Sequence, residues 1–434
     1  MATLKAVRGT RDLLPPATEL WNRVEQTARG VFARYGFGEI RTPVFEATEL
    51  FARGVGEETD IVSKEMFTWE DRARAASEKP QSLTLRPENT AGVVRAYIEH
   101  KLGDTGQLQK LFYIGPQFRR ERPQRGRYRQ FWQIGCEVLG PVSSGAESAI
   151  RDAEVLEMLA TLLDELGVKG WRLELNSVGS ATDRPRYLAA LREALAPVKD
   201  RMCEDNRRRA ETNPLRVLDS KAPEDQEIID ALPKIADYLD ESSREHFAQV
   251  RAALDACGVL YHINPRLVRG LDYYTRTTFE FTVPDGSGLG TQNALLGGGR
   301  YDGLSETLGG PRAPGIGFAI GEDRLLLTLE AQAGESARTL LDAYVAPMGV
   351  ERNAAALALA RELRRAGVSV EVGDGSFRLK KSFEAAEKIA RHIVILGEDE
   401  VASGMATVKD FATGVQDKVA QTNLSDVLKK AQRG

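Results

Sequence analysis

The sequence predicts an α+β domain that is interrupted by a helical insertion and followed by a smaller α/β domain. Three observations predict this fold class. Helix and strand patterns are mixed up to about residue 140, a highly charged helical pattern covers residues 176–264, and strands alternate regularly with helices after residue 340. At about 150 residues per domain, the 434 residues of the chain allow two or three such units.

The first region begins with a helix and continues with short strands. Apolar residues recur at helical spacing over residues 21–35, and Gly36 ends the pattern. The strand patterns that follow it cover residues 39–43, 83–85, 110–114 and 131–139.

The insertion and the region behind it differ in composition. The clearest helical stretches of the insertion are residues 199–211 and 224–256, the second of which is interrupted at Pro233. Strand patterns rich in glycine return over residues 267–321. We therefore expect the insertion to leave one sheet-containing domain and to return to it.

The last part of the chain is expected to form a separate domain. Residues 331–340 are small and polar, as in a linker. Behind them a strand at 343–345 precedes an alanine-rich helix at 353–366, and further strands and helices alternate to the end of the sequence. The predicted domains are thus residues 1–330 and 341–434.

Composition excludes several classes of protein. The chain has 59 Lys and Arg against 63 Asp and Glu, so its overall net charge of −4 does not indicate a protein that binds polyanions. Its three cysteines form no CxxC pair and its four histidines are scattered, which argues against a disulfide framework or a structural metal site. No apolar run approaches the roughly 18 residues of a membrane helix, and the N-terminus lacks an apolar signal core. We expect a cytoplasmic protein with no membrane segment.

The strongest local signal is the arginine-rich segment 118–131. It holds six arginines and one glutamate between two strand patterns, and Pro123 and Gly126 predict a turn within it. Arg127 and Arg129 would share one face if the strand pattern continues through them. Planar guanidinium groups suit phosphate oxygens, and Phe131 offers a face for a nucleobase. The alternative is a solvated basic hairpin.

Four further segments carry polar residues in unusual settings, and each has an ordinary structural explanation as well. Arg269 precedes two tyrosines in 267–276, which could form a core-edge cluster. Segments 297–304 and 315–325 are glycine-rich, as in tight turns, although the second predicts a strand that enters a helix with Arg324 in its first turn. In the last segment, 85–90, a glutamate precedes a predicted helix and could simply favour the helix dipole.

Together and in this order, the segments resemble class II aminoacyl-tRNA synthetases and, more narrowly, the bacterial histidyl-tRNA synthetase family. The opening residues 8–15 resemble the N-terminus of that family. The segments that resemble class II motifs 1, 2 and 3 are 36–43, 118–121 with the following strand, and 315–324. The segments that resemble the histidine-specific signatures are 269–274 and 298–303, and residues 212–216 resemble the family's insertion.

This resemblance implies a fold, partners and a reaction. It implies a catalytic domain on an antiparallel class II sheet, a helical insertion at about 176–264 and a C-terminal anticodon-binding domain over 341–434. The reaction would join L-histidine to ATP as an adenylate, with Mg²⁺ on the phosphates, and would then transfer the histidyl group to the 3′ end of tRNA(His). The family is also expected to form a homodimer through motif 1.

The resemblance further implies the roles of particular residues. The catalytic cations would be Arg119, Arg269 and Arg324, and ATP would also meet Glu121, Arg127 and Phe131. Arg122 and Gln124 would approach the acceptor end of the tRNA. The residues implied in histidine binding are Glu88, Asn89, Thr90, Arg119, Gln133, Glu137, Arg269, Tyr273, Tyr274 and Tyr301. Among these, Glu137 and Tyr274 would bond the two imidazole nitrogens, which fixes the tautomer of a neutral ring.

Two positions depart from the pattern of the family, and one rival function remains. Asn89 stands where glycine is usual, and Trp132 replaces a commoner histidine. The rival is a non-catalytic paralogue that resembles the histidine-sensing regulatory subunit of ATP phosphoribosyltransferase, which lacks the anticodon-binding domain and the signature arginines. A more distant alternative is a module that senses uncharged tRNA.

Overall fold

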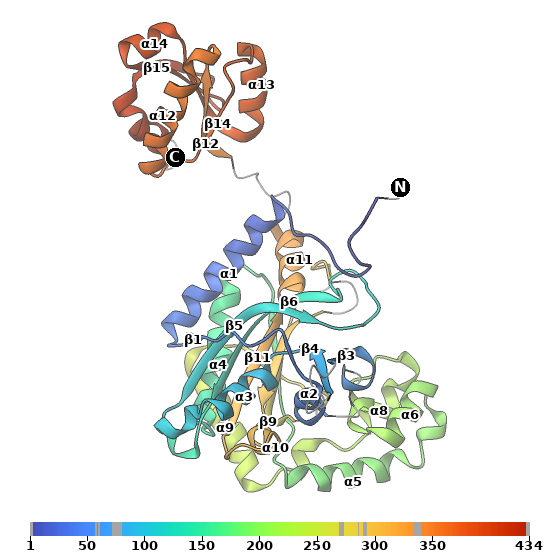
Figure 1. The fold of residues 1–434 in the computed structure, drawn as a ribbon. Coiled ribbons are helices and arrows are strands. Elements are labelled where there is room, and N and C mark those ends of the chain that lie inside the picture. The colour runs from blue at the N-terminus through green and yellow to red at the C-terminus, as the bar shows by residue number, and fades with distance from the viewer. Residues whose placement is uncertain are drawn as a thin grey trace. The chain divides into compact units, whose positions relative to one another are not determined.

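The computed structural model describes residues 3–56, 59, 61–71, 80–268, 273–284, 286–289, 293–333 and 340–430. The chain divides into two compact units, Met1–Ser336 and Ala337–Gly434 (Figure 1). No helix among these described residues is long and apolar enough to cross a membrane.

An eight-stranded sheet forms the centre of the first unit. The strands in spatial order are β1 (Gly38–Glu39), β5 (Gln109–Phe118), β6 (Gln130–Leu139), β11 (Gly315–Gly321), β10 (Ala294–Arg300), β9 (Thr275–Thr282), β7 (Arg172–Ser177) and β8 (Tyr261–Ile263). All pairs from β5 to β7 are antiparallel, whereas the edge pairs β1–β5 and β7–β8 are parallel. This architecture confirms the predicted fold class, with parallel pairing added at the two edges.

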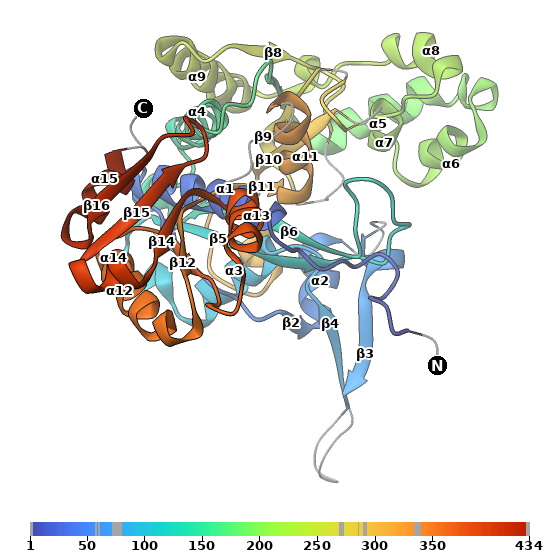
Figure 2. The same ribbon diagram turned by 90° about the horizontal axis from the view of Figure 1, so that it is seen from above.

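The main hydrophobic core lies between one face of this sheet and four helices, α1 (Ala17–Arg34), α4 (Ala149–Glu165), α9 (Glu241–Cys257) and α11 (Glu322–Ala333) (Figure 2). Strand β6 shows why it forms where the sequence predicts it. Ile134, Cys136 and Val138 alternate along β6, are fully buried and face this core. The residues that alternate with them along β6, including Gln133 and Glu137, therefore face the opposite side of the sheet.

That opposite side is covered by shorter elements. They are α2 (Thr48–Val55), α3 (Thr90–Glu99), α10 (Leu304–Thr307) and a three-stranded sheet in the order β2 (Phe45–Ala47), β4 (Gln81–Leu85), β3 (Phe67–Asp71). Val94 and Tyr97 of α3 pack with Leu139, Tyr301 and Leu304 in a second, smaller core. The segments that carry the predicted site residues therefore meet on this face.

The helical insertion connects the neighbouring strands β7 and β8. Its shorter helices, α5 (Asp183–Leu195), α6 (Glu204–Thr212), α7 (Leu215–Leu218) and α8 (Gln226–Asp230), cluster around a core of their own (Figures 1 and 2). The predicted bounds 176–264 are too wide, because residues 176–177 and 261–263 pair within the sheet. The predicted helix 199–211 is also broken, because Cys203 is extended and its N–H donates to the Asp225 carboxylate at 3.2 Å.

The second unit is an α/β domain, as predicted. Its sheet has the order β13 (Val370–Val372), β12 (Leu341–Pro347), β14 (Ala390–Leu396), β15 (Met405–Asp410), β16 (Gln416–Ala420), with the first three strands parallel. Its helices are α12 (Asn353–Arg365), α13 (Leu379–Ile389), α14 (Glu398–Ser403) and α15 (Leu424–Lys430). Alternate residues of β12 pack on α12 and α15 on one face and on α13 on the other, so the sheet is buried on both faces.

Candidate active site

A cleft of about 530 Å³ opens on the face of the sheet that carries Gln133. Its walls come from the start of α3, the ends of β5 and β6 with the loop between them, and strands β9, β10 and β11. The predicted site residues that line it are Glu88, Thr90, Arg119, Glu121, Arg127, Phe131, Gln133, Tyr273, Tyr274, Tyr301 and Arg324. Segments more than 200 residues apart in the sequence thus converge on one site. The predicted catalytic residue Arg269 lies outside the described residues.

Guanidinium groups form one wall of the cleft. The Nε of Arg119 donates to the carbonyl of Pro87 at 2.9 Å, and its guanidinium lies 5.2 Å from the centre of the Phe131 ring. Arg324, in the first turn of α11, donates through Nε to the carbonyl of Ala294 at 3.0 Å. Backbone carbonyls therefore hold both side chains at the cleft.

The charges in this wall also affect one another. Burial, followed by the positive charge of Arg127, lowers the pKa of Arg324. Arg127 in turn forms an ion pair with Glu121 at 3.3 Å. Like charges held close together in a partly buried cleft favour the binding of an anion that carries several charges, such as a triphosphate.

Small residues make room for the opposite wall. The residues of β11 that alternate with its core residues are Gly315, Gly317, Ala319 and Gly321. A Cβ at Gly317 would overlap Glu137 Oε2 and lie 2.7 Å from the backbone oxygen of Cys136. A Cβ at Gly299 of β10 would lie 2.7 Å from the ring of Tyr274. Residues 297–300 and 315–321 therefore lie in strands that admit the site side chains, and the turn of the ordinary explanation is found at residues 302–303.

Glu137 is held by hydroxyl groups beneath the cleft. Thr90 Oγ1 donates to Glu137 Oε1 at 2.7 Å, and the Tyr301 hydroxyl donates to Oε2 at 2.6 Å. Burial raises the pKa of Glu137 to about 8. Its side chain is fully buried and is not among the residues that line the cleft, so its direct contact with an imidazole nitrogen stays a prediction. The Glu137 carboxyl is connected to the cleft by hydrogen bonds from Thr90 and Tyr301, which do line it.

Glu88 both caps helix α3 and lines the cleft. Its carboxylate accepts the N–H groups of Thr90 at 2.7 Å and of Ala91 at 3.1 Å, which caps the N-terminus of α3. Burial raises its pKa. The adjacent Asn89 points elsewhere: its Oδ1 accepts the hydroxyl of Thr42 at 2.6 Å, and it does not line the cleft. The turn into α3 thus sends the side chains of Glu88 and Asn89 in different directions, and the contact of Asn89 with histidine stays a prediction.

The turn in the arginine-rich loop separates residues that the sequence groups together. Gly126 has φ of +74°, and the backbones of Gln124 and Arg127 pair across it. Arg127 lines the cleft, whereas the stem of Arg129 packs against Gly9, so the two arginines do not share a face. Arg122 and Gln124, predicted to meet the acceptor end of tRNA, are exposed and lie outside the cleft.

Some cleft residues were missed by the sequence analysis. Arg216 comes from α7 of the insertion and Glu280 from β9, and both line the cleft. Arg216 belongs to a segment that the sequence singles out, but nothing in the sequence shows that the insertion reaches the cleft. Asp323, beside Arg324, lines the cleft too; it pairs with Arg11 at 2.6 Å and accepts the Trp132 N–H at 3.2 Å.

Comparisons with known proteins identify the family of the chain. The chain matches the histidyl-tRNA synthetase family over residues 9–325 and the anticodon binding domain family over residues 342–431. It is 70% identical over 423 residues to the histidine–tRNA ligase of Koribacter versatilis (strain Ellin345), which covers 97% of this chain and 95% of that relative. It is 53% identical over 430 residues to the histidine–tRNA ligase of Solibacter usitatus (strain Ellin6076), which covers 99% of each.

Solved structures lead to the same family. The crystal structure of apo S. aureus histidyl-tRNA synthetase has a TM-score of 0.79 and 36% identity over 98% of this chain and all of that one. An ATP phosphoribosyltransferase regulatory subunit/histidyl-tRNA synthetase from Bacillus halodurans shares the fold, with a TM-score of 0.63 and 21% identity over 89% of this chain and 97% of that one. The matches over the full chain, with both domains present, favour the ligase over the regulatory alternative. The chain therefore belongs to the histidyl-tRNA synthetase family.

Proposed function

We propose that this chain is a histidine–tRNA ligase that uses ATP to activate L-histidine and transfers the histidyl group to the 3′ end of tRNA(His). The observation that supports this most directly is the meeting of two unlike walls in one cleft. Arg119, Arg127 and Arg324 line the cleft together with the hydroxyl-bearing residues Thr90 and Tyr301. A triphosphate suits the first group of residues, and a small polar amino acid suits the second.

In the first step, a carboxylate oxygen of histidine attacks the α-phosphorus of ATP while the bond to pyrophosphate breaks. Negative charge accumulates on the phosphoryl oxygens during this step. Arg119 and Arg324 are already held by carbonyl groups, so they stabilise that charge with little reorganisation. Removal of one such preorganised donor costs about 3–4 kcal/mol of transition-state stabilisation. Arg269 is proposed as a third cation at the α-phosphate.

The nucleotide end of ATP would lie against Phe131. Arg119 covers one face of the Phe131 ring, which leaves the other face of the ring for the adenine base. Glu121 is proposed to face the adenine side, while its ion-pair partner Arg127 turns toward the outer phosphates. Mg²⁺ would enter on those phosphates, since it commonly takes phosphate oxygens with one or two carboxylates. Glu280 lines the cleft near Arg324 and is a suitable carboxylate.

Histidine would bind between Gln133, Glu88 and the tyrosines. Its ammonium group would meet Glu88, Thr90 and Gln133, and Tyr274 would take one imidazole nitrogen. Glu137 would act on the other nitrogen directly or by orienting the Tyr301 hydroxyl that it accepts. Buried polar partners of this kind reject analogues without those nitrogens by roughly 10⁴-fold or more.

In the second step, the terminal ribose of tRNA(His) would accept the histidyl group. The exposed Arg122 and Gln124 are proposed to approach the acceptor end, and the second unit would read the anticodon. We also propose a homodimer formed through residues 36–43. A regulatory subunit would share the histidine pocket but would not need the second unit.

Histidine-dependent exchange of pyrophosphate into ATP tests the proposed reaction. The full chain with Mg²⁺ should catalyse exchange with histidine and not with other amino acids. Arg119→Ala should lower the exchange rate by about 10²–10³-fold. The matched control is Arg125→Ala in the same loop, which changes an exposed arginine outside the cleft and should leave the rate unchanged. Histidine binding without exchange would favour the regulatory alternative.

A further inference from the structure

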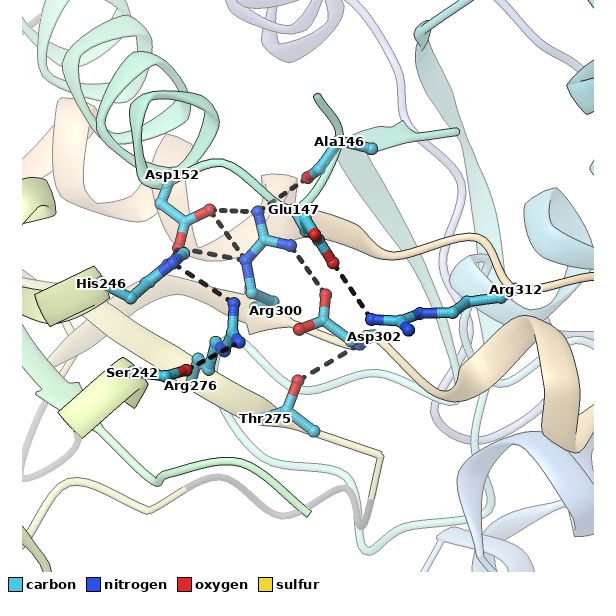
Figure 3. Close-up of polar contacts among 10 residues, drawn as sticks. All are labelled: Ala146, Glu147, Asp152, Ser242, His246, Thr275, Arg276, Arg300, Asp302 and Arg312. Atoms are coloured by element: carbon cyan, nitrogen blue, oxygen red, sulfur yellow. Dashed lines mark hydrogen bonds and ion pairs between the residues drawn. The ribbon is translucent and has the colours of Figure 1, made fainter. Parts of the chain in front are cut away.

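A buried ion-pair network lies on the face of the sheet opposite the cleft (Figure 3). Its centre is Arg300, the last residue of β10, which is fully buried together with Asp152 of α4. Arg300 Nε donates to Asp152 Oδ1 at 3.0 Å, and a terminal nitrogen donates to the same oxygen at 2.6 Å. The same terminal nitrogen also donates to the Ala146 carbonyl at 2.9 Å, and the other terminal nitrogen donates to Asp302 at 2.7 Å. Its planar head is thus held in one orientation.

The same network touches both ends of the helical insertion. His246 of α9, which leads out of the insertion, places Nε2 at 2.8 Å from Asp152 Oδ2. Its other ring nitrogen lies 3.5 Å from the guanidinium of Arg276 (Figure 3). The backbone of Arg276, at φ of +48°, exchanges hydrogen bonds of 2.7 Å with Val178 and Gly179, where the chain enters the insertion. Burial would raise the pKa of Asp152, but Arg300 and His246 outweigh it and lower that pKa to about 2.

On its other side, the network adjoins the site. Tyr301 follows Arg300 directly, and consecutive side chains at a strand end point to opposite faces. The residue after it, Asp302, is fixed as well, because its carboxylate accepts from Arg300 and its N–H donates to Thr275 Oγ1 at 3.2 Å. The backbone of Tyr301 is therefore anchored before and behind, while its hydroxyl donates to Glu137 at 2.6 Å.

We propose that Arg300, held by Asp152, whose other oxygen contacts His246, is a positioning residue that sets the Tyr301 hydroxyl against Glu137 and couples this contact to the helical insertion. The proposal rests on the proposed function, because it takes Tyr301 and Glu137 as part of the histidine subsite. Stability alone is a poor reason for such a pair, since well-packed apolar residues often replace a buried ion pair without loss. A displacement of about 1 Å at a binding group can lower a rate by about a hundredfold.

A double-mutant cycle between Arg300→Lys and Tyr301→Phe tests the proposal in the full chain. The measurements are kcat and the KM values for histidine and ATP in histidine-dependent pyrophosphate exchange. Each single variant should raise the histidine KM about tenfold, which corresponds to about 1.4 kcal/mol, and should leave the ATP KM within about twofold. The double variant should resemble Tyr301→Phe alone, because residues that act through one contact are not additive.

The matched control is Arg312→Lys, which makes the same change in an exposed ion pair with Glu147 beside the network. It should leave both KM values unchanged. His246→Gln provides a milder second cycle, because glutamine can still donate to Asp152. This variant should raise the histidine KM about threefold, and it should not add to Tyr301→Phe.

The outcomes separate the two levels of the proposal. An unchanged histidine KM in Tyr301→Phe would contradict the role of Tyr301 in the proposed histidine subsite. A raised KM in Tyr301→Phe would support that role. The positioning role is overturned if the effects of Arg300→Lys and His246→Gln on the histidine KM add in full to that of Tyr301→Phe. It is also overturned if these two variants raise the ATP KM as much as the histidine KM. If Arg300→Lys is too unstable to assay, the His246→Gln cycle decides by the same criterion.

Discussion

Replacement of Glu322 by glutamine should stabilise the protein at neutral pH. Glu322 is the first residue of α11 and is fully buried, and its two carboxylate oxygens have no hydrogen-bond partner among the described residues. Burial, together with the negative charges of Glu25 and Asp323, raises its pKa from 4.5 to about 9. At pH 7 the folded chain must therefore keep this carboxyl protonated, whereas the unfolded chain ionises it.

The sign and size of the effect follow from this difference. Because the folded-state pKa is raised, the folded state binds the extra proton and loses stability as the pH rises from about 4.5 to about 9. About 2.5 pH units of this range lie below pH 7, which amounts to about 3 kcal/mol at 1.36 kcal/mol per unit. Glu322→Gln keeps the shape of the protonated side chain and removes the titration. The gain should approach about 3 kcal/mol at pH 7 and fall to nearly zero at pH 4.5.

Urea denaturation followed by tryptophan fluorescence measures this gain. The four tryptophans of the chain, at positions 21, 69, 132 and 171, all lie in the first unit, so the signal reports on the unit that contains Glu322. The control Glu330→Gln makes the same change at an exposed position of α11 and should alter stability by less than about 0.5 kcal/mol. The reasoning is refuted if Glu322→Gln and the unaltered protein have parallel stability profiles between pH 5 and pH 8.

Three other predictions concern the cleft and the assembly. In the unaltered protein, kcat/KM for histidine should rise as the pH passes about 8, because ionised Glu137 is the stronger acceptor; a plot for Glu137→Gln that keeps the same inflection would assign it to another group. Gly317→Ala should abolish exchange and lower the urea midpoint, because its Cβ meets backbone, whereas Gly303→Ala has open space and should behave normally in both assays. Sedimentation at micromolar concentration should give a dimer, and a monomer would exclude the interface proposed at residues 36–43.

Much of the fold could be predicted because local patterns and long-range packing agree. The alternation in residues 131–139 matches the burial of Ile134, Cys136 and Val138 in β6. The strand and helix expected over residues 315–325 are β11 and α11, with Arg324 in the first turn. In each case the apolar residues of the element face the main core at a regular spacing, so their period carries the information.

The details of the site depend on geometry that no local pattern specifies. One glycine with positive φ, Gly126, sends Arg127 into the cleft and Arg129 to Gly9. Tyr301 and Glu137 meet only because β10, β11 and β6 pair in one particular register. Arg216 reaches the cleft from a helix of four residues, whose position is set by the separate core of the insertion. Such contacts need the tertiary structure.

The parallel pairing of β7 with β8 shows that the helical insertion has two parts, a crossover helix and an added group of helices. Two parallel strands cannot be joined by a hairpin and need a crossover, usually a helix. Helix α9 packs on α4 against the sheet and supplies that crossover, so β7, α9 and β8 already form a complete β–α–β unit. Helices α5 to α8 are then an insertion in the loop between β7 and α9. A short link that joins residue 178 to residue 240 in place of these helices would leave the crossover intact. Lineages could thus enlarge, exchange or excise these helices while the sheet beneath the cleft keeps its strand order.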